Sequence, residues 1–169
     1  MADIRVRRAA DGDQAALRAL RIGALTESPD AFGSTLDREL ARTDADWQRW
    51  FAPGSVAFIA TGAGADVGLV AGAHDSADPA VVQLMAMWVD PERRGSGAAD
   101  ALVAALLAWA AAEGAREVRL QVVENNQRAR SFYQRQGFRP TGRGTTRPRD
   151  GAPEIEMARS GNREPVVSV

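Results

Sequence analysis

The chain of 169 residues has no cysteine, no lysine and a single histidine. Without cysteine it can form no disulfide bond, no thiolate metal site and no cysteine nucleophile. One histidine is too few for a histidine-based metal cluster, so we expect no bound metal. Without lysine, the phosphate-binding pattern GxxxxGK[ST] of P-loop proteins is excluded.

Strong charge and long apolar runs are also missing. A formal net charge of −1 lacks the basic excess of most nucleic-acid-binding domains, so we expect no nucleic-acid partner. The longest apolar stretch, residues 101–112, is shorter than the about 20 residues that span a bilayer. The charged start, MADIRVRRAADGDQ, is not followed by the apolar block of a signal peptide. The composition therefore predicts a single soluble, cytoplasmic domain with a substantial core and no membrane partner.

The sequence does contain a strand that runs through a loop of small residues into a helix. Residues 81–89, VVQLMAMWV, have the apolar character of a buried strand, and the Asp-Pro that follows ends it. Residues 94–99, RGSGAA, lead into an Ala- and Leu-rich helix that reaches about residue 113. Backbone N–H groups at such a helix start converge and attract an anion, which predicts a site for a phosphorylated cofactor. A dinucleotide fingerprint GxGxxG is excluded, because Asp100 stands where its last glycine is required.

Arg94, Gly97 and Ala99, placed after the strand end MWVDP, resemble the pyrophosphate loop of the GNAT superfamily of N-acetyltransferases. The pattern of that loop is (Gln/Arg)-x-x-Gly-x-(Gly/Ala). For this motif alone, an ordinary strand, turn and helix is the alternative interpretation, with glycines that serve only the turn.

A second motif, NQRARSFYQRQGF over residues 126–138, resembles the GNAT pattern Asn-x-x-Ala-x-x-(Leu/Phe)-Tyr-x-x-x-Gly-Phe. Asn125 or Asn126 can cap a helix through its side-chain oxygen, and Gly137 suits a left-handed helix end. Two motifs in the family's order and spacing are far more specific than either alone. On these residues the chain is identified as a member of the GNAT superfamily.

The resemblance implies an α/β (α+β) fold, with one GNAT-like domain over residues 3–159 and a loose tail over residues 160–169. We expect a central mixed, mostly antiparallel sheet of about six to seven strands flanked by about four helices. Apolar periodicity, caps and breakers predict the individual elements. Strands are expected at residues 4–8, 56–61, 67–71, 81–89, 118–122, 138–141 and 154–158, and helices at residues 13–27, 36–51, 98–113 and 126–136.

The resemblance also implies transfer of an acetyl group from acetyl-coenzyme A, as co-substrate, to a primary amine by direct attack in a ternary complex. This chemistry requires a deprotonated amine, a stabilised oxyanion and a protonated leaving thiolate. Tyr133, the only tyrosine, occupies the family's position for the acid that protonates the thiolate; packing on an amphipathic helix is the alternative role. The residues expected to bind the cofactor are Met87, Trp88, Val89, Arg94, Gly95, Ser96, Gly97, Ala98, Ala99, Asp100 and Asn126.

Two positions depart from the family's usual pattern. Asp100 follows the loop where many relatives carry Arg or Lys, and an acid beside a pyrophosphate is unfavourable. Gln121 stands on the strand where several relatives carry a glutamate base. Glutamine takes up no proton, so the base must lie elsewhere or be a water chain to solvent. The candidates for a replacement base are Glu124, Glu27, Glu39 and His74.

The acceptor site is expected between residues 27–51 and 143–153, from the first helices and the last hairpin loop. We favour a small-molecule amine as acceptor over a protein N-terminus. A non-catalytic acyl-coenzyme A sensor, which would keep the loop without a base, is the alternative from another class. The hypothesis of an enzyme that acts on another phosphorylated ligand is supported by the loop alone. The chain could also form a homodimer. The expected acceptor-site residues are Phe32, Glu39, Trp47 and Gln121.

Overall fold

The structure, a computed structural model, describes residues 3–161 and contains seven strands, five α-helices and three short 3-10 helices over this range. The strands are β1 (Arg5–Arg8), β2 (Ser55–Gly62), β3 (Ala65–His74), β4 (Val81–Val89), β5 (Glu117–Val123), β6 (Arg139–Thr146) and β7 (Pro153–Ser160). The α-helices are α1 (Gln14–Glu27), α2 (Leu36–Leu40), α3 (Asp44–Gln48), α4 (Ala98–Ala112) and α5 (Gln127–Arg135). The 3-10 helices are η1 (Pro29–Ala31), η2 (Arg49–Phe51) and η3 (Pro91–Arg93).

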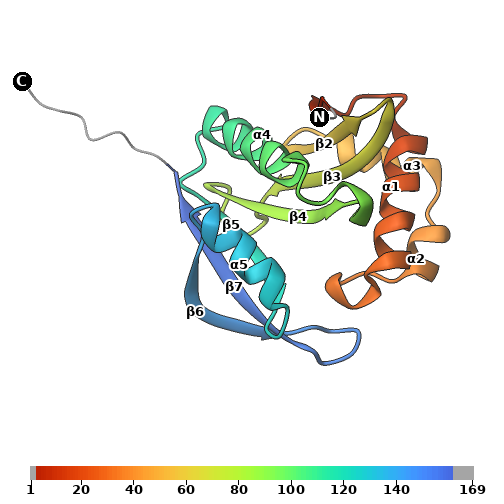
Figure 1. The fold of residues 1–169 in the computed structure, drawn as a ribbon. Helices are drawn as coiled ribbons and strands as arrows, with labels where there is room; N and C mark the ends of the chain where they lie inside the picture. Colours follow the sequence, from red (N-terminus) through yellow and green to blue (C-terminus); the bar gives the residue numbers. More distant parts are fainter. Residues whose placement is uncertain (1–2, 162–169) are drawn as a thin grey trace, which may run out of the picture.

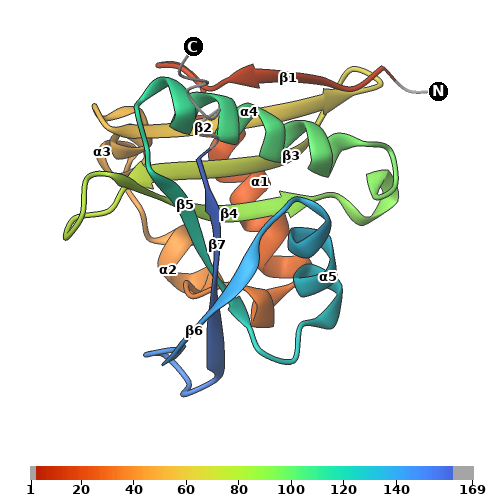
Figure 2. The ribbon, with the colours of Figure 1, turned by 90° about the vertical axis from the view of Figure 1, so that its left-hand side faces the viewer.

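All seven strands belong to one sheet, in the order β1-β2-β3-β4-β5-β7-β6. Neighbouring strands are antiparallel except for β4 and β5, which are parallel. Helices α4 and α5 lie on one face of the sheet, and α1, α2 and α3 lie on the other (Figures 1 and 2). The predicted mixed, mostly antiparallel fold is confirmed, with one more α-helix than expected.

The prediction of one helix over residues 36–51 is wrong, because this segment forms three short helices, α2, α3 and η2. The Thr43 hydroxyl accepts a hydrogen bond from the Asp46 N–H, and the Asp46 carboxylate accepts one from the Thr43 N–H. This capping box starts a new helix at Asp44 instead of continuing the old one. At the other end of the chain, β6 is longer than predicted and leaves a loop of residues 147–152. Of the predicted loose tail, Ser160 still belongs to β7 and the Gly161 N–H donates to the Arg116 carbonyl oxygen, while residues 162–169 lie outside the described residues.

The core has two layers, one on each face of the sheet. Leu102 and Leu106 of α4 are fully buried in the first layer, and Leu17 of α1 is fully buried in the second. A Cβ added to Gly72 of β3 would lie 2.6 Å from Leu106, so α4 packs directly on the sheet backbone at this point. None of the described helices is long and apolar enough to cross a bilayer.

The sheet opens between β4 and β5. These strands pair over only Val81–Gln83 and Glu117–Arg119. Beyond this contact β4 continues to Val89 and β5 to Val123 while the two strands diverge (Figure 2). The sheet therefore has two halves, and beside their separation residues 85–87 of β4 are exposed or half-buried.

A β-bulge lies in β4 beside this opening. Ala71 pairs with Met85 and Leu69 pairs with Trp88, so residues 86–87 together stand opposite Val70. Ala86 has a φ of 56°, which is uncommon for a residue with a Cβ atom. A bulge interrupts the regular ladder and redirects the backbone. The amides of residues 86–87 are therefore turned out of the regular pairing with β3.

Candidate active site

The loop between β4 and α4 presents its backbone to open space. Gly95 and Gly97 have φ values of 80° and 88°, in the left-handed region that favours glycine. A Cβ added to either glycine would meet no atom within 4 Å. Gly97 is the N-cap of α4, and the first N–H groups of a helix have no carbonyl partner within it. An anion can therefore reach these N–H groups at the positive end of the helix dipole.

This loop forms one wall of a cleft of about 450 Å³ between β4, α5 and the segment after α1. Of the residues predicted to bind the cofactor, only Ser96 and Ala98 are not on its wall, and the Ala98 side chain is buried. The fold thus gathers residues that are far apart in the sequence. The predicted cofactor residues on the wall are Met87, Trp88, Val89, Arg94, Gly95, Gly97, Ala99, Asp100 and Asn126.

Positive side chains surround the cleft. Arg93, Arg128 and Arg135 line it, and none of their guanidinium groups has a hydrogen bond or ion pair with another residue in the range 3–161. The carboxylate of Asp100, which departs from the family pattern, accepts a hydrogen bond from Gln136 Nε2 at 2.5 Å. Asp100 thereby connects α4 to the end of α5, and the three arginines on the same cleft wall carry the opposite charge.

Glu27, at the end of α1, also lines the cleft. Its carboxylate accepts hydrogen bonds from the Ser28 hydroxyl, from Trp88 Nε1 at 3.0 Å and from Arg94 Nη2 at 2.9 Å. Burial acts to raise the pKa of Glu27, but these donors outweigh it and lower the pKa from 4.5 to about 2. A carboxylate with so low a pKa is a weak base, which argues against Glu27 as the replacement base. Glu27 instead fixes the positions of Trp88 and Arg94.

Tyr133 reaches the cleft from α5 and is 8% exposed. Its ring packs against Phe132 and Phe138, with centroid separations of 5.2 and 5.7 Å. Burial raises the pKa of the Tyr133 phenol, so the hydroxyl keeps its proton at neutral pH. Both roles considered for Tyr133, packing and proton donation, are compatible with this position.

The predicted acceptor residues are not gathered at one place. Phe32 lies on the cleft wall, with its ring 4.8 Å from the Arg21 guanidinium carbon. Glu39 and Trp47 are each only 1% exposed. Glu39 pairs with Arg42 Nε at 2.6 Å, and Trp47 belongs to the core beneath α1. Since neighbouring side chains enclose both, the structure argues against the predicted acceptor contacts of Glu39 and Trp47, and against Glu39 as a base.

Two further base candidates lie away from the cleft wall. His74 contacts the Pro79 carbonyl oxygen at 2.7 Å and Glu113 Oε2 at 3.3 Å. Glu113 follows the far end of α4, and the 15 residues of that helix span about 22 Å at a rise of about 1.5 Å per residue. Glu124 is exposed in the turn before α5. His74 is therefore too remote to take the proton of an amine in the cleft.

Gln121 on β5 has Glu156 on β7 as its cross-strand partner. Glu156 is 9% exposed and accepts hydrogen bonds from Thr141, Arg143 and Gln121. Alternation along residues 154–158 indicates that Glu156 points away from the main core. Sequence analysis did not single it out, because its place beside Gln121 depends on strand pairing.

Hydrogen bonds join the loop after β6 to the segment after α1. Arg147, 2% exposed, donates from Nη1 to the carbonyl oxygens of Asp30 at 2.8 Å and Phe32 at 3.2 Å. Arg149 donates from Nη2 to the Pro29 carbonyl oxygen at 2.8 Å. The sequence predicts these two segments as walls of the acceptor site, but it gives no sign of the bonds between them.

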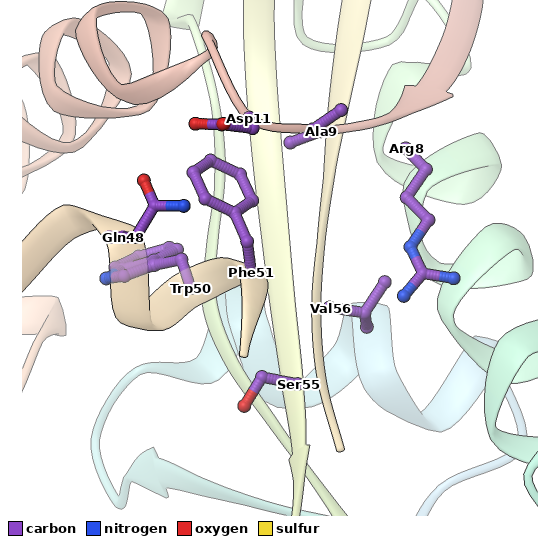
Figure 3. Close-up of a pocket in the computed structure, with 9 residues that line it drawn as sticks. Arg8, Ala9, Asp11, Gln48, Trp50, Phe51, Ser55 and Val56 are labelled. Atoms are coloured by element: carbon purple, nitrogen blue, oxygen red, sulfur yellow. The ribbon is translucent and has the colours of Figure 1, made fainter. Parts of the chain in front are cut away.

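A second hollow, of about 440 Å³, lies beside Ser55 at the start of β2, the end of the central strands that is remote from the cleft (Figure 3). Asp11, Gln48, Trp50 and Phe51 lie together along it. Its wall contains no glycine loop, no start of a long helix and none of the predicted site residues. The cleft beside α4 is therefore the better candidate for the active site.

The chain matches the Acetyltransferase (GNAT) family over residues 23–138. It is 34% identical over 130 residues to a mycothiol acetyltransferase of Thermobispora bispora, an alignment that covers 75% of this chain and 43% of that protein. The chain thus spans less than half the length of this relative.

Two solved structures show the same fold. A GNAT-family acetyltransferase from Streptococcus pneumoniae is similar with a TM-score of 0.80 at 19% identity, covering 95% of this chain and 100% of that one. The structure of yncA from Salmonella typhimurium, determined with its cofactor acetyl-CoA, gives a TM-score of 0.77 at 15% identity and covers 99% of each chain. At these identities the likeness concerns the fold alone.

Proposed function

Because this chain belongs to the GNAT family of acetyltransferases, as its two motifs predict, we propose that it acetylates a primary amine of a small molecule, using acetyl-coenzyme A in a ternary complex. One observation carries the proposal. The glycine loop at the start of α4 and the buried Tyr133 line the same cleft. In this proposal the pyrophosphate site and the proton donor for the leaving thiolate would therefore lie on the same cleft.

The residues of the cleft fit this co-substrate, which supplies the activated acetyl group as a thioester. The N–H groups at the start of α4 would hold the pyrophosphate. Arg93, Arg128 and Arg135 would add positive charge for the phosphates. Asn126 caps α5 by accepting a hydrogen bond from the Ala129 N–H at 3.2 Å, and its side-chain NH₂ group would serve the pantetheine arm.

The bulge in β4 would stabilise the oxyanion that forms on the acetyl group. Met87 lines the cleft, and the bulge releases residues 86–87 from regular pairing with Val70. Backbone N–H groups held in a site with little water stabilise a developing negative charge, by roughly 3 kcal/mol for each donor. The strained φ of Ala86 would thus serve to present these donors.

The Tyr133 hydroxyl would protonate the leaving thiolate. In water a phenol has a pKa of about 10 and a thiol about 8.5, so this transfer is uphill. Burial raises the pKa of Tyr133, and the same surroundings would raise the pKa of the coenzyme thiol. The proton would therefore move as the C–S bond breaks and charge collects on sulfur.

Two observations support a small acceptor. The hydrogen bonds of Arg147 and Arg149 cross between the two segments predicted to wall the acceptor site, so an extended polypeptide could not lie there without breaking them. The relative with 34% identity is named mycothiol acetyltransferase, and this name does not mention a protein as the acceptor.

The test is a screen of amines by thiol release from acetyl-coenzyme A, followed by Tyr133→Phe with the best acceptor. This change removes one oxygen and little packing. General acid catalysis typically contributes about 10² to 10⁴ in rate, so kcat should fall by about that factor while the Kd for acetyl-coenzyme A stays nearly constant. Unchanged turnover, with chemistry shown to be rate-limiting, would assign the proton to water or to the substrate ammonium.

The same screen separates the enzyme from a sensor. Gln121, at the place of a usual glutamate base, is the observation that favours a non-catalytic protein. Tight binding of acetyl-coenzyme A without turnover of any amine would support the sensor and contradict the proposed transfer.

A further inference from the structure

Gln121 and Glu156 form a pair across two neighbouring strands of the separated half of the sheet. They are direct partners in the antiparallel register of β5 and β7, so their side chains lie on the same face. Their neighbours Leu120 and Met157 are buried in the core under α4 and α5. Gln121 and Glu156 therefore point to the opposite face, on the side of α1 and α2. Position 121 carries no carboxylate, but Glu156 provides one on the neighbouring strand.

The two oxygens of Glu156 differ in their contacts. Oε1 accepts hydrogen bonds from the Thr141 hydroxyl at 2.9 Å and from Arg143 Nε at 2.9 Å. Oε2 has one contact within residues 3–161, a long hydrogen bond from Gln121 Nε2 at 3.4 Å. A carboxylate oxygen can accept two hydrogen bonds, so Oε2 has room for a further donor. Arg143 and Thr141 hold the carboxylate in place through Oε1. The side of Oε2, next to Gln121, is the open side of the carboxylate.

This open side lies where β4 and β5 begin to separate. The last paired residues are Gln83 and Arg119, and Gln121 is the next residue of β5 on the same face. Across the opening, Met85 of β4 is 45% exposed although it lies in the middle of a strand. The cleft wall begins two residues later, at Met87. An amine that approaches the acetyl group from the side of α1 and α2 would pass this place.

We propose that Glu156 is the residue that binds the acceptor ammonium and takes its proton, in place of the glutamate that several relatives carry at position 121. The inference rests on the proposed function. In this step the N–H bond of the ammonium breaks, its electron pair stays on nitrogen, and the proton passes to Glu156 Oε2. The neutral amine then attacks the acetyl carbonyl, and the C–S electron pair leaves with sulfur, which takes the proton of the Tyr133 hydroxyl. The product nitrogen then loses its second proton, which returns through solvent to the Tyr133 oxygen, so the product is a neutral amide and Tyr133 is restored. Gln121 positions the carboxylate by its hydrogen bond and stays uncharged.

The experiment compares three variants with an amine that the unmodified chain acetylates. Glu156→Gln keeps the shape and most hydrogen bonds but removes the proton acceptor, and kcat/KM for the amine should fall by about 10² or more. Glu154→Gln is the matched control, because it makes the same change two residues away on the same strand, opposite Val123. Its kcat/KM should stay within about twofold of the unmodified value. The exchanged variant Gln121→Glu/Glu156→Gln returns a carboxylate to the usual strand and should recover at least about tenfold over Glu156→Gln.

Binding measurements separate a catalytic role from a structural one. The Kd of acetyl-coenzyme A should not change in Glu156→Gln, because the loop at α4 is not altered. An equal loss of acetyl-coenzyme A affinity, full activity of Glu156→Gln, or failure of the exchanged variant to exceed Glu156→Gln would each overturn the inference. If the unmodified chain acetylates no amine, the proposed function itself is contradicted.

Discussion

The carboxylate of Glu27 connects three elements that meet at the cleft. It lies at the end of α1 and binds Trp88 of β4 and Arg94 of the glycine loop. Its pKa in the folded chain is lowered from 4.5 to about 2. A group with a lowered pKa stabilises the fold above its unfolded pKa, and this contribution is lost as the pH falls through the folded pKa.

We therefore expect the stability difference between the unmodified chain and Glu27→Gln to depend on pH. The unmodified chain should have the higher free energy of unfolding above pH 4.5, and the difference should shrink as the pH falls toward 2. The Glu27 side chain is 34% exposed, so solvent screens the ion pair and we expect a modest difference. Urea unfolding from pH 7 to pH 2.5 measures it. A difference independent of pH would assign the effect to the neutral hydrogen bonds.

Single side chains differ in how far the sequence alone predicts their surroundings. Phe32 was predicted to face the acceptor, and the structure places it on the cleft wall. Glu39 was predicted as an acceptor contact from its charge, but it is buried beside Arg21 and Arg42. The sequence could not show the ion pair with Arg21, because Arg21 comes from another helix. A charge on a predicted helix is ambiguous until its neighbours in space are known.

Elements with a local cause are predicted well. Asn126 caps α5, and Gly137 ends it with a φ of 88°, because cap and helix end depend on residues within one turn. The division of residues 36–51 also has a local cause, the capping box of Thr43 and Asp46. The sequence carries that signal as T-D-A-D, with the capping threonine and aspartate three residues apart. The bulge at Ala86 has no local signal, since it results from the register with β3.

The two ends of α4 provide a controlled test of the glycine loop. Gly97 precedes the helix and Gly114 follows it; both have positive φ, and a Cβ on either would meet no atom within 4 Å. Gly97→Val and Gly114→Val should therefore cost similar stability, roughly 1–2 kcal/mol each from the left-handed backbone.

Only Gly97→Val should weaken the binding of acetyl-coenzyme A. Only at this position would the new side chain lie between the phosphate oxygens and the first N–H groups of the helix. We expect at least about a tenfold increase in Kd, or about 1.4 kcal/mol, measured by calorimetry. Equal Kd values for the two variants would show that the anion does not bind at the start of α4.

At the scale of the whole molecule, the site depends on pairings between distant segments. The opening between β4 and β5, the contact of Gln121 with Glu156 and the bonds of Arg147 all join parts of the chain that the sequence separates widely. Two local motifs identified the family and most of the cleft wall. The residues around the predicted acceptor site were not predictable in the same way, because no short sequence motif specifies which strands pair with each other.

Binding of the co-substrate should stabilise the whole fold, since the cleft lies between β4, α5 and the segment after α1. Acetyl-coenzyme A at about 100 times its Kd should add about 2.7 kcal/mol to the free energy of unfolding. For a chain of this size each kcal/mol raises Tm by roughly 2–4 °C, so we expect a shift of roughly 5–11 °C. ATP and NAD⁺ serve as phosphorylated controls without a pantetheine arm and should give much smaller shifts. An equal shift with either control would favour another phosphorylated ligand, since pyrophosphate contacts alone would then account for binding. No shift with acetyl-coenzyme A, in a chain shown to be folded, would contradict both the enzyme and the sensor.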